Sequence, residues 1–214
     1  MKNGICYIVG AGENYGLDFI PSANDLVIAA DAGIRYLEEC GINADLVIGD
    51  FDSLNDIPTY PNTMALSPEK DDTDMLAAVR EGIKAGYSDF HIYCGMGGRI
   101  DHTIANLQVL AYLSENDMRG FLFGKDSVIT AITNQKISFE KVPSGYISVF
   151  SYTEKAEGIY LRGLKYELTD AVLTNTFPLG VSNEFIGRES SISVSSGTLL
   201  IVLPKECLSA AFKI

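Results

Sequence analysis

Short apolar runs alternate with amphipathic helical patterns through the first part of the chain. The runs are apolar at successive positions, as in strands buried on both faces of a parallel sheet. They occupy residues 5–9, 26–30, 46–48 and 90–94. The helical patterns fall at residues 32–41, 72–86 and 101–116. This alternation predicts a parallel α/β sheet, Rossmann-like in arrangement, in an N-terminal domain of residues 1–130.

The remaining chain, residues 131–214, has a different pattern. Short segments such as ISVFSY and SISVS alternate apolar and polar residues and are separated by Gly, Ser and Asn. Such alternation with a period of two is typical of strands with one buried face. We therefore expect a C-terminal antiparallel β-sandwich.

The acidic residues are concentrated in the first domain. The formal net charge of the chain is −12. Residues 1–130 contain 8 Lys and Arg against 20 Asp and Glu, whereas residues 131–214 contain 8 of each kind. This charge disfavours nucleic acid and anionic membranes as partners, but it permits a polyphosphate if divalent cations bridge the acids to the phosphates. The first residues resemble a strand rather than a signal peptide, and no apolar run could span a bilayer, so we expect a cytoplasmic protein.

The cysteines and histidines exclude one class of metal site. The four cysteines are widely separated and form no Cys-x-x-Cys pair, so we expect reduced thiols. Only His91 and His102 could supply imidazole, and His102 is expected at the start of a helix without a chemical role. A bound metal would therefore be held by oxygen, as magnesium, calcium and manganese are.

Carboxylates follow several of the predicted strands. Because the carboxyl ends of parallel strands form one rim of a sheet, we expect these side chains to gather there. They are Asp31, Asp50, Asp52, Asp71, Asp74 and Asp101. Asp50 and Asp52 lie two positions apart, which puts both on one side of an extended segment, and converging carboxylates favour a cation between them. One such aspartate alone would be explained by a turn or a helix cap.

A glycine-rich turn at residues 95–99 precedes the third helix. Gly97 and Gly98 allow backbone N–H groups to approach a phosphate, and Arg99 could add a bidentate contact. A tight turn would require the same glycines. Lys70 is a further candidate phosphate ligand, whereas Lys125 is expected to be solvent-exposed.

Two alternative interpretations fit these glycines and acidic residues. Gly10, Gly12 and Gly16 follow the first strand and Asp31 follows the second, which resembles a dinucleotide-binding fingerprint with altered glycine spacing and would suit an NAD-dependent oxidoreductase. The acids would also suit a non-enzymatic, calcium-binding interaction module. No Walker A motif is present.

Five segments in order resemble the thiamine pyrophosphokinase family. They are AADAG (29–33), IGDFDS (48–53), PEKDDTD (68–74), GGRIDHTIAN (97–106), and GLKYELTD with GVSNEF (163–170 and 180–185). The resemblance spans both dissimilar halves of the chain. It implies transfer of the diphosphate group of ATP to the hydroxyl of thiamine, giving thiamine diphosphate and AMP. It also implies Mg²⁺ as cofactor and a homodimer with a shared active site, in which residues 131–214 bind thiamine and form the dimer.

The resemblance also assigns roles to residues. Those expected to take part in catalysis are Asp50, Asp52, Asp71, Asp74 and Asp101, with Asp50, Asp52 and Asp74 holding the metal. Those expected to contact the nucleotide are Asp31, Thr73, Gly97, Gly98 and Arg99. Lys70 is added to them from its place near a predicted strand end, since the family varies at that position. Ser182 and Asn183 are expected to bind thiamine. Asp71 and Asp101 are the two candidate proton acceptors, and because the chain lacks tryptophan, Tyr166 or Phe185 would stack on thiamine.

Overall fold

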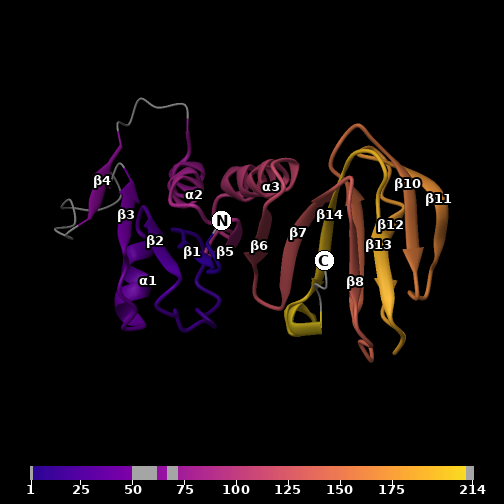
Figure 1. The fold of residues 1–214 in the computed structure, drawn as a ribbon, viewed down its shortest axis with the longest axis horizontal. Helices are drawn as coiled ribbons and strands as arrows, with labels where there is room; N and C mark the ends of the chain where they lie inside the picture. Colours follow the sequence, from indigo (N-terminus) through magenta and orange to yellow (C-terminus); the bar gives the residue numbers. More distant parts are fainter. Residues whose placement is uncertain (1, 50–61, 67–71, 211–214) are drawn as a thin grey trace. The chain divides into compact units, whose positions relative to one another are not determined.

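The computed structural model describes residues 2–49, 62–66 and 72–210 of the 214-residue chain (Figure 1). The chain divides into two compact units. The first comprises residues 1–109 and 118–125, and the second comprises residues 110–117 and 126–214.

The first unit is built on a parallel sheet. Its strands, in spatial order, are β6 (Arg119–Phe123), β5 (Asp89–Tyr93), β1 (Cys6–Val9), β2 (Leu26–Ala30), β3 (Leu46–Gly49) and β4 (Thr63–Ala65). Every pairing between these neighbours is parallel. The strands β1 and β2 are almost wholly buried, which explains their apolar residues at successive positions.

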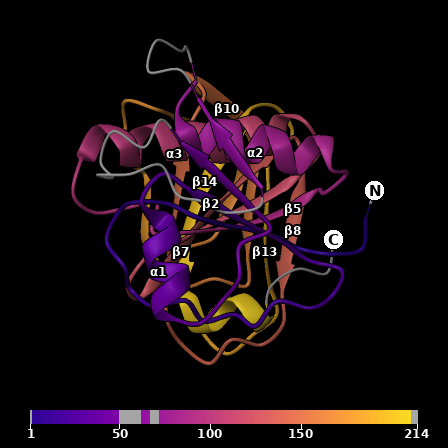
Figure 2. The ribbon, with the colours of Figure 1, turned by 90° about the vertical axis from the view of Figure 1, so that its left-hand side faces the viewer.

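Within the described residues, three helices lie between these strands: α1 (Gly33–Glu39), α2 (Asp74–Lys84) and α3 (Ile100–Glu115). Figures 1 and 2 show α2 and α3 side by side, with α1 apart from them. Thr73 caps α2, because its hydroxyl accepts a hydrogen bond from the Leu76 N–H at 3.2 Å. The helices α1 and α2 bury one face each, as their sequence spacing predicts.

The chain reverses its direction across the sheet at β1. From β1 it proceeds through β2 and β3 to β4, then returns by α2 to β5, on the other side of β1, and continues by α3 to β6. In open α/β sheets, ligands bind at the carboxyl ends of the strands where the strand order reverses. The neighbouring ends of β1 and β5 are therefore the expected location of a site.

An aromatic cluster covers the face of β1, β5 and β6 that bears Tyr7, His91 and Phe121. Phe19, from the connection between β1 and β2, stacks on Tyr7 with 4.0 Å between ring centroids. His91 lies edge-on to Tyr7 and Phe121, at 5.5 and 5.2 Å. Burial, assisted by the Arg119 charge, lowers the pKa of His91 to about 4, so this imidazole is neutral near pH 7.

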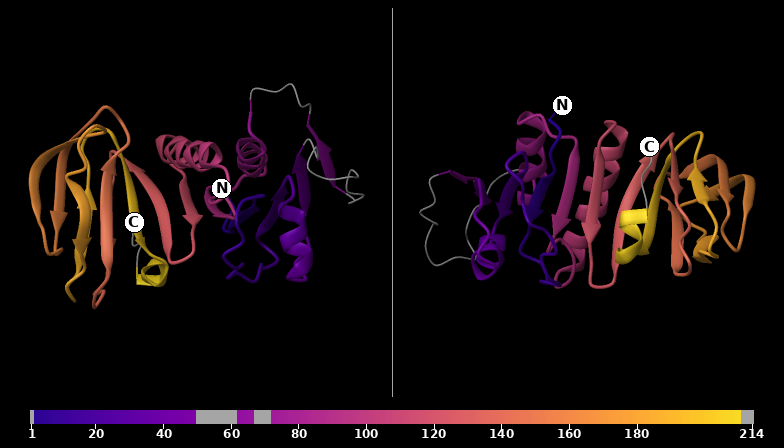
Figure 3. Two further views of the ribbon diagram at one scale, coloured as in Figure 1. Left: turned by 180° about the vertical axis from the view of Figure 1, so that it is seen from behind. Right: turned by 60° about the horizontal axis from the view of Figure 1, so that its bottom comes forward.

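The second unit contains two antiparallel sheets. One has the strand order β12 (Gly180–Glu184), β9 (Tyr146–Ser151), β14 (Thr198–Pro204) and β7 (Ser127–Thr133). The other has the order β11 (Leu168–Thr174), β10 (Lys155–Arg162), β13 (Ser190–Ser193) and β8 (Lys136–Phe139). From residue 126 onward, Figure 3 shows strands and the yellow helical turn η1 (Lys205–Ala210).

The fold class predicted from the sequence is confirmed: a parallel α/β sheet is followed, from residue 126 onward, by two antiparallel sheets, as in a β-sandwich. Within the described ranges, no helix is long and apolar enough to cross a membrane.

Acid should destabilise the aromatic cluster around His91. Below pH 6.5 the unfolded chain binds a proton at His91 that the folded chain does not accept until about pH 4, so the free energy of unfolding falls as the pH falls through this window. Relative to His91→Phe, which cannot titrate, the wild type should lose about 2 kcal/mol between roughly pH 7 and pH 5. Urea denaturation of both proteins measures this loss, and identical pH dependences would contradict it.

Burial raises the pKa of the neighbouring Asp89, against the opposing effect of its ion pair with Arg119. That shift acts in the opposite direction on stability, because the folded chain then holds a proton more readily than the unfolded chain. Because Asp89 Oδ1 also lies 3.6 Å from His91 Nε2, the two proteins are compared with Asp89→Asn present in both, so that only the histidine titration differs.

A candidate nucleotide site where the strand order reverses

Two loops meet in backbone contact where β1 and β5 end. The N–H of Gly12 donates to the carbonyl of Cys94 at 2.7 Å, and the N–H of Glu13 donates to the carbonyl of Met96 at 2.8 Å. We call residues 10–13 the first loop and residues 94–98 the second loop. These bonds continue the β1–β5 pairing beyond the sheet, so the two loops are held together.

Glycine is required in the first loop because the second loop lies so close. A Cβ atom at Gly12 would lie 2.5 Å from the Met96 carbonyl oxygen and 2.6 Å from that of Cys94. A Cβ atom at Gly10 would lie 2.8 Å from the Cys94 carbonyl oxygen. These approaches are shorter than real Cβ contacts, so any side chain would force the loops apart.

A cavity of about 590 Å³ opens beside the two loops. Of the residues predicted to bind nucleotide or metal, six line it: Asp31, Thr73, Asp74, Gly97, Gly98 and Arg99. They come from the end of β2, the start of α2 and the loop between β5 and α3. The structure therefore brings together residues that are separated by up to 68 positions in the sequence (31 to 99).

Two residues of the cavity wall have left-handed backbone conformations that are unusual for residues with side chains. Asp31 and Cys94 both have φ of 52°. They follow β2 and β5 directly, and the Asp31 N–H donates to the Ile48 carbonyl at 2.7 Å. Such conformations cost roughly 1–2 kcal/mol each and cluster at functional sites. Here they turn the chain sharply at the end of each strand.

Arg99 and Asp101 form an exposed, two-bonded ion pair. The Arg99 Nη2 lies 2.6 Å from Asp101 Oδ2, and its Nε lies 3.2 Å from Oδ1. Arg99 lines the cavity, whereas Asp101 is not among the lining residues. The hydrogen bond from Arg99 lowers the pKa of Asp101, which weakens this carboxylate as a proton acceptor.

The donor atoms at the cavity suit a hard cation. Asp31 and Asp74 supply carboxylate oxygens. The Cys94 thiol is buried, which raises its pKa to about 12, so it remains protonated and is a poor metal ligand. Among residues 2–49, 62–66 and 72–210 no cluster of three His, Cys, Asp or Glu side chains could hold a metal. Oxygen donors of this kind fit Mg²⁺.

Four of the predicted site residues lie outside the described residues: Asp50, Asp52, Lys70 and Asp71. Their roles stay predictions.

Several residues that line the cavity were not predicted from the sequence, and three of them make side-chain hydrogen bonds. Tyr36 of α1 donates its hydroxyl hydrogen to the Gly12 carbonyl at 3.0 Å, and Asn106 of α3 donates to the Gly95 carbonyl at 2.6 Å. Glu13 accepts a hydrogen bond from Tyr15 at 2.7 Å. The sequence offered one signal, the amide Asn106 among the apolar residues of a predicted helix, and the structure buries it.

In the second unit, Asn183 is committed to the backbone of Tyr166. Its Nδ2 donates to the Tyr166 carbonyl at 2.7 Å, and its Oδ1 accepts from the Tyr166 N–H at 2.9 Å.

The other residues predicted to contact thiamine differ in their exposure. Ser182 is exposed and has a left-handed φ of 57°. Tyr166 is 58% exposed, whereas Phe185 is 2% exposed and packs on Phe139. Phe185 therefore cannot stack on a ligand, and of the two predicted aromatic residues only Tyr166 can.

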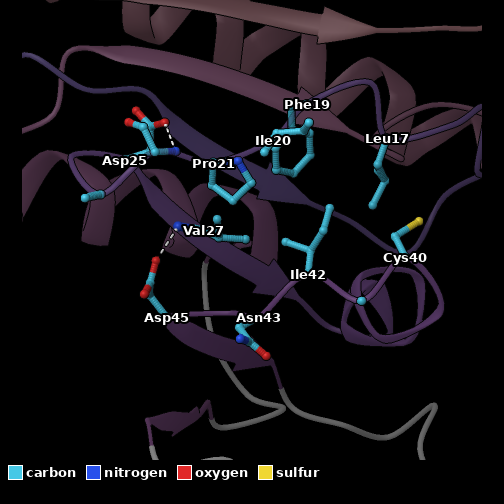
Figure 4. A pocket seen from close by; sticks show the side chains of 13 residues that line it. Leu17, Phe19, Ile20, Pro21, Asp25, Val27, Cys40, Ile42, Asn43 and Asp45 are labelled. Atoms are coloured by element: carbon cyan, nitrogen blue, oxygen red, sulfur yellow. Dashed lines mark hydrogen bonds between the residues drawn. The ribbon is translucent and has the colours of Figure 1, made fainter.

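A second cavity lies at the amino ends of β2 and β3 and carries no comparable chemistry (Figure 4). Figure 4 shows apolar side chains such as Ile20 and Ile42 beside two carboxylates. Asp25 accepts hydrogen bonds from the N–H groups of Ile5 and Ser22, and Asp45 accepts one from the N–H of Val27. These carboxylates therefore stabilise the starts of the strands.

The structure does not support the interpretation of Gly10, Gly12 and Gly16 as a dinucleotide-binding fingerprint. In that fingerprint the glycines open a helix whose N-terminus faces the pyrophosphate. Residues 10–25, all of which are described, contain no helix. Gly10 and Gly12 instead allow the first loop to approach the second.

Comparison with known proteins agrees with this geometry. Residues 19–122 match the family model "Thiamin pyrophosphokinase, catalytic domain", and residues 134–199 match the model "Thiamin pyrophosphokinase, vitamin B1 binding domain". The chain belongs to the thiamin pyrophosphokinase family. Family membership and the enzymatic character expected from the five segments are thus confirmed, and the oxidoreductase and calcium-module alternatives find no support.

Other members of the thiamin pyrophosphokinase family match most of this chain. The thiamine pyrophosphokinase of Bacillus subtilis is 28% identical over 184 residues, which cover 83% of this chain and 86% of that protein. Its crystal structure has a TM-score of 0.81 at 25% identity, covering 94% of this chain and 99% of that one. A thiamin pyrophosphokinase family protein from Enterococcus faecalis has a TM-score of 0.81 at 26% identity, with 94% and 98% covered. The Candida albicans thiamin pyrophosphokinase, at 16% identity and a TM-score of 0.72, shares the fold.

Proposed function

We propose that this enzyme transfers the terminal diphosphate of ATP to the primary hydroxyl of thiamine, giving thiamine diphosphate and AMP. The observation that carries the proposal is the cavity at the reversal of strand order. It is lined by six residues that the resemblance to this family assigns to nucleotide and metal, and these six lie within the segment matched by the catalytic-domain model. A cytoplasmic location, where ATP is supplied and thiols stay reduced, agrees with the four free cysteines.

The reaction forms a bond between the thiamine oxygen and the β-phosphorus and breaks the bond from that phosphorus to the oxygen that leaves with AMP. Such a transfer depends on positioning and on neutralising charge. Asp74, together with Asp50 and Asp52, would hold Mg²⁺, which draws charge from the phosphates when bound. Arg99 and the second loop, at Gly97 and Gly98, would orient the phosphates, and Asp31, Thr73 and Lys70 would complete the nucleotide contacts.

A carboxylate would accept the proton of the thiamine hydroxyl. The candidates are Asp71 and Asp101. Because pairing with Arg99 lowers the pKa of Asp101, that residue is the weaker base, and we assign the role to Asp71.

Thiamine binding is assigned to the second unit. Ser182 would contact the aminopyrimidine, and the exposed ring of Tyr166 would stack on it. Since both polar atoms of the Asn183 side chain bond the backbone of Tyr166, Asn183 would act chiefly by fixing that ring. Thiamine is a cation, so the acidic first unit also favours its capture.

A homodimer with a shared active site agrees with large apolar side chains that the second unit exposes. Val172, Phe177, Leu179 and Val181 lie in the segment from β11 to β12, and Tyr146 lies on β9, which pairs with β12. These side chains are 43–69% exposed, and exposed apolar side chains are often covered at an interface. Sedimentation at micromolar concentration should give the mass of a dimer, and a monomer mass would exclude the shared site.

The metal-binding role of Asp74 and Asp50 is tested by replacing each of them, with a neighbouring aspartate as the control. Protein mixed with ATP, magnesium and thiamine should release AMP and thiamine diphosphate in equal amounts. Asp74→Asn and Asp50→Asn should each lower kcat/KM by about 100-fold or more, because metal-held charge stabilisation is lost. Asp72→Asn is the matched control, since Asp72 pairs with Arg80 and does not line the cavity, and it should stay within about threefold of wild type. Wild-type turnover in Asp74→Asn would refute the metal assignment.

The stacking role of Tyr166 predicts a selective effect on one substrate. Tyr166→Ala should raise KM for thiamine about tenfold and leave KM for ATP unchanged, because a buried stacking contact contributes about 1 kcal/mol or more. Tyr166→Phe keeps the ring and should behave like wild type. Steady-state kinetics with each substrate varied in turn measures both constants, and equal increases in the two would speak against separate binding regions.

A further inference from the structure

The two loops are each held by a hydrogen bond from a different helix. Tyr36 reaches the first loop from α1 and bonds the Gly12 carbonyl at 3.0 Å. Asn106 reaches the second loop from α3 and bonds the Gly95 carbonyl at 2.6 Å. Both side chains line the cavity. We propose that Tyr36 and Asn106 are positioning residues that fix the loops for binding the phosphates of the nucleotide, an inference that rests on the proposed function for the identity of the ligand.

The hydrogen bond from Tyr36 also fixes the orientation of backbone groups in the second loop. A peptide unit is planar, so fixing a carbonyl also fixes the N–H of the following residue. Tyr36 holds the Gly12 carbonyl, and the N–H of the same peptide, from Glu13, donates to the Met96 carbonyl at 2.8 Å. The peptide of that carbonyl ends in the N–H of Gly97. Tyr36 thus orients a candidate phosphate donor through two successive peptide units.

Asn106 acts on the preceding peptide of the same turn. By holding the Gly95 carbonyl it fixes the N–H of Met96. The contact is tight, since a Cβ atom at Gly95 would lie 3.1 Å from Asn106 Nδ2. Asn106 is 5% exposed, and a buried amide inside a helix is unfavourable unless its hydrogen bonds are made. An apolar side chain would suit helix packing as well, so the amide is explained by the loop that it holds.

Loops held in this way need not be ordered when the nucleotide binds. Preorganised donors bind phosphate more tightly because the ordering cost has been met during folding. Losing either hydrogen bond should therefore weaken the nucleotide and leave thiamine unaffected.

Two matched pairs of variants test the proposal in the full-length chain. Tyr36→Phe removes one hydroxyl group, and its control is Tyr87→Phe, which removes an equivalent bond at 2.9 Å to the Asn24 carbonyl near the amino ends of the strands. Asn106→Leu keeps the volume without the donor, and its control is Asn116→Leu, which removes an amide bond at 2.7 Å to Tyr112 near the end of the same helix. KM is measured for ATP and for thiamine, and deuterium exchange is measured at the amides of residues 95–98.

Tyr36→Phe and Asn106→Leu should each raise KM for ATP about three- to tenfold, with KM for thiamine unchanged, and should speed exchange at residues 95–98 by a similar factor. Both controls should leave these values at wild type. An unchanged KM for ATP, or equal increases in both constants with faster exchange throughout the chain, would overturn the proposal. If the wild type forms no thiamine diphosphate, the proposed function fails, and unchanged exchange at residues 95–98 would separately overturn the positioning role.

Discussion

The contact between two backbone segments at the ends of β1 and β5 is the constraint on which the candidate site depends. The Gly12 N–H reaches the Cys94 carbonyl at 2.7 Å, a separation that leaves no space for a side chain at position 12. Because the loops meet there, the wall formed by Gly97 and Gly98 lies in the same cavity as Asp31, which follows another strand. The reversal of strand order places the two loops side by side, and glycine allows them to touch.

Several chemical features of the site follow from that arrangement. Asp31 and Cys94 turn sharply with left-handed backbones, a strain that the surrounding hydrogen bonds must offset. Tyr36 and Asn106 then fix the loop carbonyls from two helices. The second unit contributes different chemistry, with the exposed aromatic ring of Tyr166 and other exposed apolar side chains, in agreement with the proposed division between nucleotide and thiamine.

Much of the fold could be predicted from the sequence because burial leaves a clear pattern. Successive apolar residues at 26–30 mark a strand covered on both faces, and the alternation in ISVFSY marks one with a single buried face. The gathering of Asp31 and Asp74 also followed from topology alone. The reason for Gly10 and Gly12 could not be predicted, because it lies in a neighbour 82 positions away (12 to 94). Likewise, nothing local distinguishes Phe185 from Tyr166, although packing buries one ring and exposes the other.

The affinity of Gly12→Ala for ATP with magnesium, measured by titration calorimetry, tests the central constraint most directly. The added methyl group must push the Met96 and Cys94 carbonyls away, so we predict ATP binding at least about tenfold weaker than wild type. Gly41→Ala is the comparison: it strains a left-handed residue with open space around it, and it should lower stability without changing ATP affinity. Wild-type ATP affinity in a folded Gly12→Ala protein would contradict the account.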